Sequence, residues 1–256
     1  MGKRIEHAPG TFSYVELSTS DTEAAKSFYG SLFGWDYEDT ELPEDAGGGT
    51  YTTCNVEGDT AAAIFKGDGS LPPHWNNYVT VESAEGAKSK ATELGGQVMM
   101  GPIDVMGFGH MVAIADPTGG AFMAWEPAQS IGAQRVNDPG CMTWNELHTT
   151  DVDAALEFYT GMFGWNTEEM ESGGGPRYVV VKVGERSNGG VMGTQEGEPS
   201  NWMPYFTVES RDAAVSTTGE GGGNVLVELE FGPGLVAAIA DPQGAIFGVF
   251  EGDVDD

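Results

Sequence analysis

Residues 10–35 read GTFSYVELSTSDTEAAKSFYGSLFGW, and residues 140–165 read GCMTWNELHTTDVDAALEFYTGMFGW. Twelve of these 26 positions are identical, at a constant offset of 130 residues. Internal similarity of this kind, with one unit repeated along the chain, indicates a tandem duplication. The chain is therefore expected to hold two copies of one domain.

The similarity continues through the rest of both copies. HWNNYVTVES at 74–83 matches NWMPYFTVES at 201–210, and IADPTGGAFMAW at 114–125 matches IADPQGAIFGVF at 239–250. The offset falls to 127 and then 125 residues, so the second copy lacks a few loop residues.

Each copy is predicted to contain two βαβββ units. The alternating residues from Tyr14 to Thr19 predict a strand. The SDTE sequence at 20–23 is a capping box, and an apolar stripe from Ala24 to Leu32 predicts the helix that Gly34 ends. Short strands separated by glycine-rich turns follow, and the second half of the copy repeats the order.

The junction between the copies has the composition of a linker. Residues 127–140, PAQSIGAQRVNDPG, are rich in proline, glycine and polar side chains. We therefore predict a first domain at 8–128, a linker at 129–139 and a second domain at 140–252. The predicted fold class is α+β, with four βαβββ units.

The charge of the chain excludes several classes of partner. Eleven basic and 40 acidic residues give a net charge of −29, which argues against nucleic acids and anionic membranes. The acidic surface is either a soluble, self-repelling surface or an adaptation to high salt. No apolar run is long enough to span a bilayer and no secretory signal is apparent, so a cytoplasmic location is expected.

Two recurring signatures, DxxxAxxFYxxxFGW after a first strand and ADPxG before a last strand, carry a resemblance. With the four βαβββ units, they resemble the vicinal oxygen chelate superfamily of glyoxalases, bleomycin-resistance proteins and extradiol dioxygenases. The tandem arrangement resembles a bacterial glyoxalase-like or hydroxylase-like subgroup. The resemblance implies that each pair of units forms an eight-stranded cup, which often holds a divalent metal.

The positions that this resemblance assigns to metal ligands carry unsuitable side chains. They are held by Tyr14, Trp144, Met123, Gly248, Asn76 and Met203. Indole has no lone pair to offer, and a phenol ligates only after losing its proton. We therefore predict no metal ligands and no cofactor. The alternative is a non-standard divalent-metal site of Glu146, His148 and a third residue such as His110, which requires units to pair across the copies.

Matched acidic residues are expected on the cup faces. Alternation places Tyr14, Glu16 and Ser18 on one side of the first strand, and Trp144, Glu146 and His148 on the same side in the second copy. Burying a carboxylate in an apolar cup costs free energy unless the group is paired, solvated or required for function. Glu146, assisted by His148, is the candidate catalytic base, and the alternative is a structural acceptor of backbone hydrogen bonds.

Large apolar residues replace or flank the expected ligand positions and define a candidate pocket. Gly248 is expected to leave room that Met123 fills in the first copy, so the two cups need not be equivalent. The predicted ligand-binding residues are Tyr14, Glu16, Trp75, Met123, Trp125, Trp144, Trp202 and Phe250.

Three functions are compatible with these residues. The first is a metal-independent protein that binds an aromatic or hydrophobic small molecule in an apolar cup. The alternative is a glyoxalase-like lyase or isomerase, or a hydroxylase-type enzyme, that uses Glu146 as base. A structural protein with degenerate cups is the third. The expected partner is a small molecule, and the chain is expected to be a monomeric pseudo-dimer or a homodimer.

Overall fold

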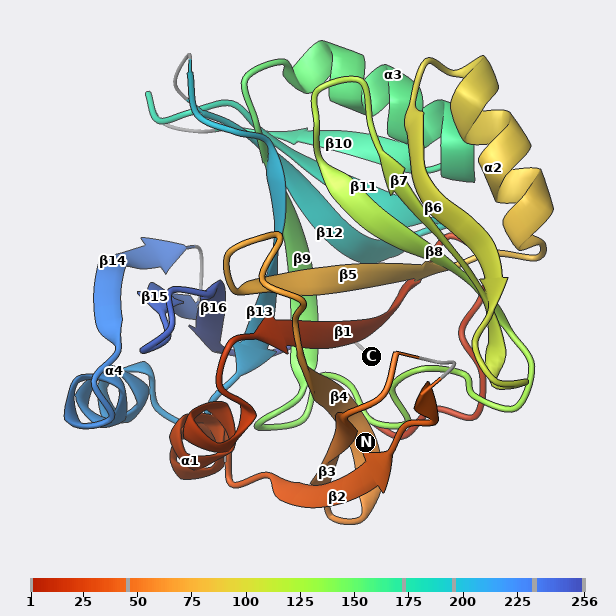
Figure 1. Ribbon diagram of the computed structural model, residues 1–256. Helices are drawn as coiled ribbons and strands as arrows, with labels where there is room; N and C mark the ends of the chain where they lie inside the picture. Colours follow the sequence, from red (N-terminus) through yellow and green to blue (C-terminus); the bar gives the residue numbers. More distant parts are fainter. Residues whose placement is uncertain (1, 45–46, 172–173, 195–196, 232–233, 255–256) are drawn as a thin grey trace.

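The computed structural model describes residues 2–44, 47–171, 174–194, 197–231 and 234–254, and it contains two eight-stranded sheets (Figure 1). The first copy forms β1 (Phe12–Thr19), α1 (Thr22–Phe33), β2 (Asp36–Glu41), β3 (Thr50–Val56), β4 (Asp59–Lys66), β5 (His74–Thr80), α2 (Ala84–Glu93), β6 (Gln97–Asp104), β7 (Gly109–Ala115) and β8 (Ala121–Pro127). The second copy forms β9 (Met142–Thr149), α3 (Val152–Phe163), β10 (Asn166–Met170), β11 (Tyr178–Val183), β12 (Arg186–Gly193), β13 (Asn201–Thr207), α4 (Arg211–Glu220), β14 (Asn224–Phe231), β15 (Gly234–Ala240) and β16 (Ile246–Glu251). The predicted α+β class and the four βαβββ units are confirmed.

The units of one copy join through their first strands. The strand order is β2-β3-β4-β1-β5-β8-β7-β6 in the first sheet, and the second sheet repeats it. β1 and β5 pair antiparallel, as do β9 and β13. Units therefore pair within a copy. His110 and Glu146 belong to different sheets, so the pairing that a shared metal site would need is absent.

The ends of α1 and α3 follow from the repeated signature. Asp21 accepts a hydrogen bond from the backbone N–H of Ala24 at the start of α1, and Asp151 caps α3 in the same way. Each helix ends at a glycine, Gly34 or Gly164, in the left-handed conformation with φ near 70°. The glycine signals at the C-terminal ends are confirmed, whereas the capping box at 20–23, which would make Ser20 the N-cap of α1, is corrected by one residue to Asp21.

The two copies share one hydrophobic core. The helices of each copy cover one face of its own sheet and meet helices of the other copy, with α1 against α4 and α2 against α3 (Figure 1). A single cluster of buried side chains runs through both copies and includes Leu17, Phe28, Trp75, Phe206 and Phe247. The opposite face of each sheet therefore stays outside the shared core.

Two tyrosines of the repeated helix signature hydrogen-bond across this core. Tyr29 donates to Asp241 Oδ2 of the other copy at 3.0 Å and accepts from Trp75 Nε1 at 3.3 Å. In the second copy, Tyr159 accepts from Trp202 Nε1 at 2.7 Å, and its hydroxyl lies 3.5 Å from the carbonyl oxygen of Gly120. Burial, and then the nearby Asp241 carboxylate, raise the pKa of Tyr29, so its hydroxyl stays protonated and donates.

The tryptophans that end the same signature also cross between copies. Trp35 Nε1 donates to the carbonyl of Gly140 at 2.7 Å, and Trp165 Nε1 donates to that of Gly10 at 2.8 Å. Both indoles are almost fully buried. Each copy therefore places its tryptophan on the backbone that leads into the first strand of the other.

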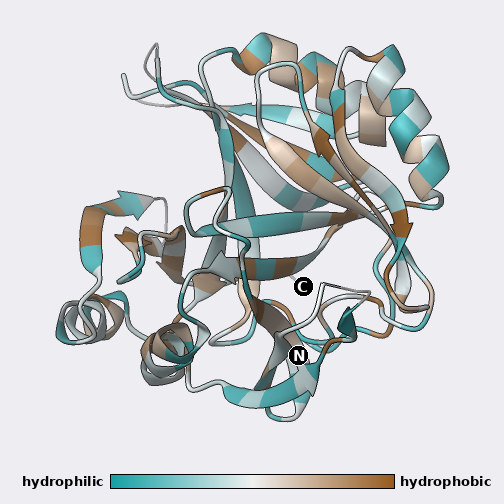
Figure 2. Ribbon diagram, in the orientation of Figure 1, coloured by the Kyte–Doolittle hydropathy of each residue, from teal (hydrophilic) through white to brown (hydrophobic). Residues whose placement is uncertain are grey.

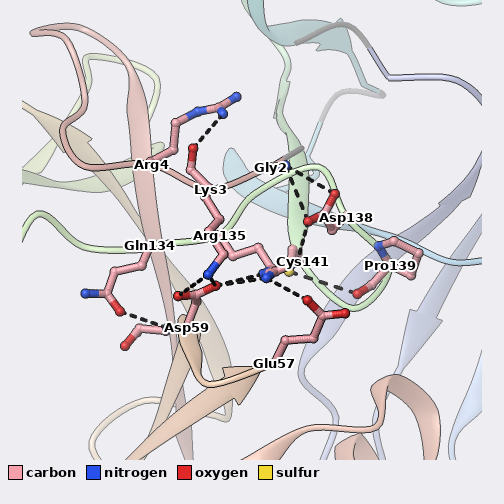
Figure 3. A network of polar contacts seen from close by, with 11 residues as sticks. Gly2, Lys3, Arg4, Glu57, Asp59, Gln134, Arg135, Asp138, Pro139 and Cys141 are labelled. Carbon is pink, nitrogen blue, oxygen red and sulfur yellow. Dashed lines mark hydrogen bonds and ion pairs between the residues drawn. The ribbon is translucent and has the colours of Figure 1, made fainter.

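A buried arginine holds the linker against the first domain (Figure 3). Arg135 forms ion pairs with Glu57, Asp59 and Asp138, all at about 2.8–2.9 Å. The backbone N–H of Gly2 donates to the same Asp138 carboxylate. One guanidinium thus ties the start of the described chain, the β3–β4 turn and the linker together.

The outer strands are exposed on both faces. β2, DYEDTE, is mostly acidic and appears teal in Figure 2, whereas β6 and β14 include brown, apolar segments. Among the described residues, the longest helices have 12 residues, and none has the length and apolar character needed to cross a bilayer.

The hydrogen bonds of Tyr29 predict a measurable loss of stability. Tyr29→Phe leaves the Asp241 oxygen and the Trp75 N–H buried without their partner, so we expect the free energy of unfolding to fall by about 1–3 kcal/mol. Urea denaturation measures this change. Ser31→Ala is the control, since Ser31 lies on the exposed side of the same helix, and it should cost less than about 0.5 kcal/mol. Equal losses in the two variants would contradict this role for Tyr29.

Candidate functional site

The candidate sites lie on the sheet faces that the shared core leaves uncovered. On the first sheet, Tyr14 and Glu16 of β1 pair with Tyr78 and Asn76 of β5. We call this face cup 1. The corresponding face of the second sheet, where Trp144, Glu146 and His148 pair with Tyr205, Met203 and Asn201, is cup 2.

Cup 1 gathers three tyrosines around one carboxyl group. The Tyr78 hydroxyl donates to Glu16 Oε2 at 2.7 Å. The hydroxyls of Tyr14 and Tyr51 lie 3.4 Å apart, and the rings of Tyr14 and Tyr78 meet edge to face. Tyr51 comes from β3, so three strands supply the cluster.

Burial controls the protonation of this cluster. Burial raises the pKa of Glu16, and hydrogen bonds from Tyr78 and Tyr51 and the nearby His74 oppose the increase. Burial also raises the pKa values of Tyr14 and Tyr78, and the Glu16 charge raises them further. The tyrosines are therefore neutral hydrogen-bonding groups, and Glu16 holds its proton to a higher pH than an exposed glutamate.

Cup 2 contains a carboxylate–imidazole pair. His148 Nε2 lies 2.8 Å from Glu146 Oε1, and the Tyr205 hydroxyl donates to the same oxygen at 2.9 Å. The side chain of Glu146 is 9% exposed and that of His148 is 22% exposed. In cup 1 the position of His148 is occupied by Ser18, so only cup 2 has this pair.

Trp144 and Tyr178 complete cup 2. Trp144 Nε1 donates to the Tyr178 hydroxyl at 3.0 Å. Burial, and then the Glu146 charge, raise the pKa of Tyr178. Trp144 and Tyr178 occupy the positions of Tyr14 and Tyr51, so the two cups share a plan but differ in hydrogen-bonding groups.

Gly248 corrects one expectation from the sequence. The space beside it is not empty, because a Cβ atom there would overlap the ring of Tyr205. Tyr205, Met203 and Ala238 instead form a small buried cluster on this face, with Trp144 packed against it. Glycine is needed at 248 so that the Tyr205 ring can lie close to the backbone of β16.

Apolar side chains extend from both cups toward the outer strands. In cup 1, Met123 pairs with Tyr78, and Trp125 meets the Tyr78 ring edge to face. Phe250 is the counterpart of Trp125 in cup 2 and is partly exposed. Met123, Trp125 and Phe250 thus lie on the cup faces, and their role in ligand binding stays a prediction.

Trp75 and Trp202 were expected to line the cups, and this expectation is wrong. Both side chains are buried in the shared core and donate to Tyr29 and Tyr159. Their neighbours Tyr78 and Tyr205 face the cups instead. The WxxY spacing therefore places the tryptophan and the tyrosine on opposite faces of the strand.

Tyr51 and Tyr178 were not among the site residues predicted from the sequence. A signal was available, because the two tyrosines are related by the offset of 127 residues that relates Tyr78 to Tyr205. Tyr51 is the second residue and Tyr178 the first residue of the third strand of its unit. Only the sheet order shows that this strand lies close enough to reach the carboxyl group.

The residues present do not fit a divalent metal. Among the described residues, no three His, Cys, Asp or Glu side chains lie together in a group able to hold a metal ion. Tyr14 keeps its proton, Trp144 is a donor only, and Glu146 already accepts from Tyr205. The donor set in both cups suits neutral hydrogen bonds better than metal coordination.

Two surface grooves lie outside the cups. One of about 330 Å³ lies between α2 and α3, where Lys90 and Met162 contribute to its lining. The other, of about 440 Å³, lies between α1 and α4. No residue of the Glu16 or Glu146 clusters lines either groove.

Comparison with known proteins gives a consistent relationship. Residues 11–123 match the model of the Glyoxalase/Bleomycin resistance protein/Dioxygenase superfamily, and residues 142–184 match the Bleomycin resistance protein-like N-terminal model. The chain is 40% identical to the "Putative glyoxylase CFP32" of Mycobacterium tuberculosis, over 98% of each protein. It is 32% identical to the "Anthracycline biosynthesis protein DnrV" of Streptomyces peucetius, over 95% of this chain and 94% of that protein.

Solved structures share the fold at low sequence identity. A Mn(II)-bound glyoxalase from Novosphingobium aromaticivorans superposes with a TM-score of 0.68 at 14% identity, covering 100% of this chain and 85% of the other. The 2,3-dioxygenase LapB from Pseudomonas sp. KL28 gives a TM-score of 0.68 at 15% identity, covering 96% and 94%. At these identities the likeness concerns the fold alone.

The raised pKa of Glu16 predicts a pH-dependent effect of Glu16→Gln. Between the unfolded and folded pKa values, the folded chain binds more protons, so the Glu16 contribution to stability falls as pH rises. The variant cannot titrate there. We therefore expect the free energy of unfolding of Glu16→Gln, relative to the wild type, to increase as pH rises from below 4 through the folded pKa. Urea denaturation across this range tests it, and a difference that does not change with pH would contradict the buried-acid interpretation.

Proposed function

Because the chain belongs to the glyoxalase/bleomycin resistance protein/dioxygenase superfamily, we propose that it binds a flat, apolar small molecule in its cups without a divalent metal. The observation that carries this proposal is the pair of glutamates in aromatic surroundings. Glu16 and Glu146 each accept a hydrogen bond from a cup tyrosine. Each carboxyl group is the polar anchor for one oxygen or nitrogen atom of the bound molecule.

The apolar surface around these anchors supports the same proposal. Met123 and Trp125 in cup 1, and Phe250 in cup 2, supply surface that can cover an aromatic ring. The name of the DnrV relative, which refers to anthracycline biosynthesis, is compatible with a role in small-molecule metabolism. The acidic chain has few cations with which to attract an anionic ligand.

A screen of naphthalene, anthracene and dicarbonyl compounds by thermal shift, followed by calorimetry, tests the proposal. For a compound that binds in cup 2, Glu146→Gln should weaken binding about tenfold, because a carboxylate acceptor is replaced by a weaker amide. Thermal stability should change little, since the glutamine oxygen can still accept from Tyr205. Glu157→Gln, an exposed substitution on α3, is the control.

Two results would contradict the binding role. A large loss of thermal stability in Glu146→Gln, with unchanged affinity for the ligand, would show that Glu146 has a structural role instead. Failure of every compound in the panel to bind would remove the proposal for flat apolar ligands.

A second candidate is an acid–base enzyme in cup 2, a lyase, an isomerase or a hydroxylase-type enzyme. The contact between His148 and Glu146 favours it, because a carboxylate orients an imidazole for proton transfer. The sequence alone suggested Glu146 as base and His148 as its assistant. The geometry supports the reverse assignment, since Glu146 also accepts from Tyr205 and is the more buried of the two.

Deuterium exchange tests this second candidate. If His148 removes a proton next to a carbonyl group, the protein should accelerate exchange into 2-tetralone in D₂O, followed by NMR. His148→Gln should lower the rate by about a hundredfold or more. Ser18→Ala in cup 1 is the control and should leave the rate unchanged. Equal rates for His148→Gln and the wild type would rule out this role for His148.

A further inference from the structure

The hydrogen bonds of cup 1 leave the Tyr14 hydroxyl with only a long contact to Tyr51, while Tyr51 also lies close to Glu16. Tyr78 donates its one proton to Glu16 at a good distance of 2.7 Å. Tyr14 and Tyr51 approach each other at only 3.4 Å, which is long for a bond between two hydroxyl groups. Two hydroxyls share this weak contact, so a ligand oxygen beside them would make a better bond than they make with each other.

The same cluster can both donate to and accept from one ligand group. Each tyrosine hydroxyl has one proton and two lone pairs, and Glu16 has acceptor capacity beyond the bond from Tyr78. An O–H group fits this combination, because it accepts from a tyrosine and donates to the carboxyl oxygen. A hydrocarbon edge would leave both sides unpaired.

The basic side chain near the cluster is a histidine, His74, and not a lysine or an arginine. Among the described residues that share this face by strand register there is no lysine or arginine. They include Thr53, Ala63, Phe65, His74, Asn76, Ala113 and Met123. At the edge of the face, Glu38 adds an acidic side chain, because it pairs with Thr53. A carboxylate or phosphate would therefore be buried next to Glu16 without a lysine or arginine to balance its charge, which is costly.

Apolar residues continue from the cluster to the edge of the sheet. Met123 pairs with Ala113 of β7, which pairs with Met100 of β6. In the same way, Trp125 pairs with Met111 of β7, which pairs with Ile103 of β6. Met100 is 46% exposed and Ile103 is 41% exposed. Methionine adapts its shape to irregular apolar partners, so this surface suits the face of an aromatic ring.

Cup 2 lacks the long contact between two hydroxyl groups. Trp144 stands in place of Tyr14 and donates to Tyr178 at 3.0 Å, an ordinary hydrogen bond from a group that cannot accept. Met203 replaces Asn76 on the neighbouring strand. The capacity for one additional hydroxyl is thus a property of cup 1.

From this geometry we propose that cup 1 selects uncharged aromatic molecules carrying a single hydroxyl group, and rejects aromatic carboxylates and phosphates. Tyr14, Tyr51 and Glu16 hold the hydroxyl, and the methionine-lined strands cover the ring. This inference rests on the proposed binding function and specifies the ligand class of one cup.

Three naphthalene probes separate the contributions at pH 7. Naphthalene measures the apolar contact, 2-naphthol adds a neutral hydroxyl, and 2-naphthoate adds a carboxylate. Calorimetry should show one site that binds 2-naphthol about tenfold more tightly than naphthalene. The affinity of 2-naphthoate at this site should not exceed that of naphthalene.

Variants then assign the preference to the cluster. Tyr51→Phe should reduce the affinity for 2-naphthol to near that for naphthalene, and Glu16→Gln is a second variant should Tyr51→Phe fail to fold. Tyr37→Phe is the matched control, because Tyr37 donates to the backbone of α1 outside the cups and its loss should leave the preference intact.

The outcomes distinguish this inference from the function on which it rests. Equal affinities for naphthalene and 2-naphthol, or tightest binding of 2-naphthoate, would overturn the hydroxyl selection while leaving apolar binding in place. An unchanged preference in Tyr51→Phe and Glu16→Gln would also overturn it. Absence of binding by all three probes would contradict both proposals.

Discussion

Each copy has one tyrosine that makes a buried contact with the other copy, and the rest of the structure depends on these two contacts. Tyr29 bridges Trp75 of its own copy and Asp241 of the other, and Tyr159 has the equivalent place beside Trp202 and Gly120. The groups involved are buried, so each must keep its partner or leave a polar atom unpaired. The two copies are thereby fixed in one arrangement with a common core.

That arrangement decides which surfaces remain for function. The helices and the tryptophans pack between the two copies and cover one face of each sheet. The opposite face of each sheet is therefore free to form a cup. Glu16 and Glu146 lie on these faces because strand residues alternate. The superfamily signatures thus maintain the interface, while the cup residues differ between the copies, as Ser18 and His148 do.

Duplication allows the two cups to diverge within one stable framework. Tyr14 and Tyr51 give cup 1 a pair of neutral hydroxyls, whereas in cup 2 the Trp144 indole donates to the Tyr178 hydroxyl. Cup 2 has the carboxylate–imidazole pair instead.

The sequence by itself determined the duplication, the four βαβββ units and the helix end at Gly34, because these depend on local periodicity and capping. It also identified Glu16 and Glu146 as matched cup residues, since alternation along a single strand suffices. Only the tertiary structure placed Trp75 in the core and brought Tyr51 beside Glu16. Those positions depend on which strands are neighbours, and β3 reaches β1 only through β4. The reason is physical: periodicity along a strand assigns a side chain to a face, but contacts between strands far apart in sequence arise only when the sheet forms.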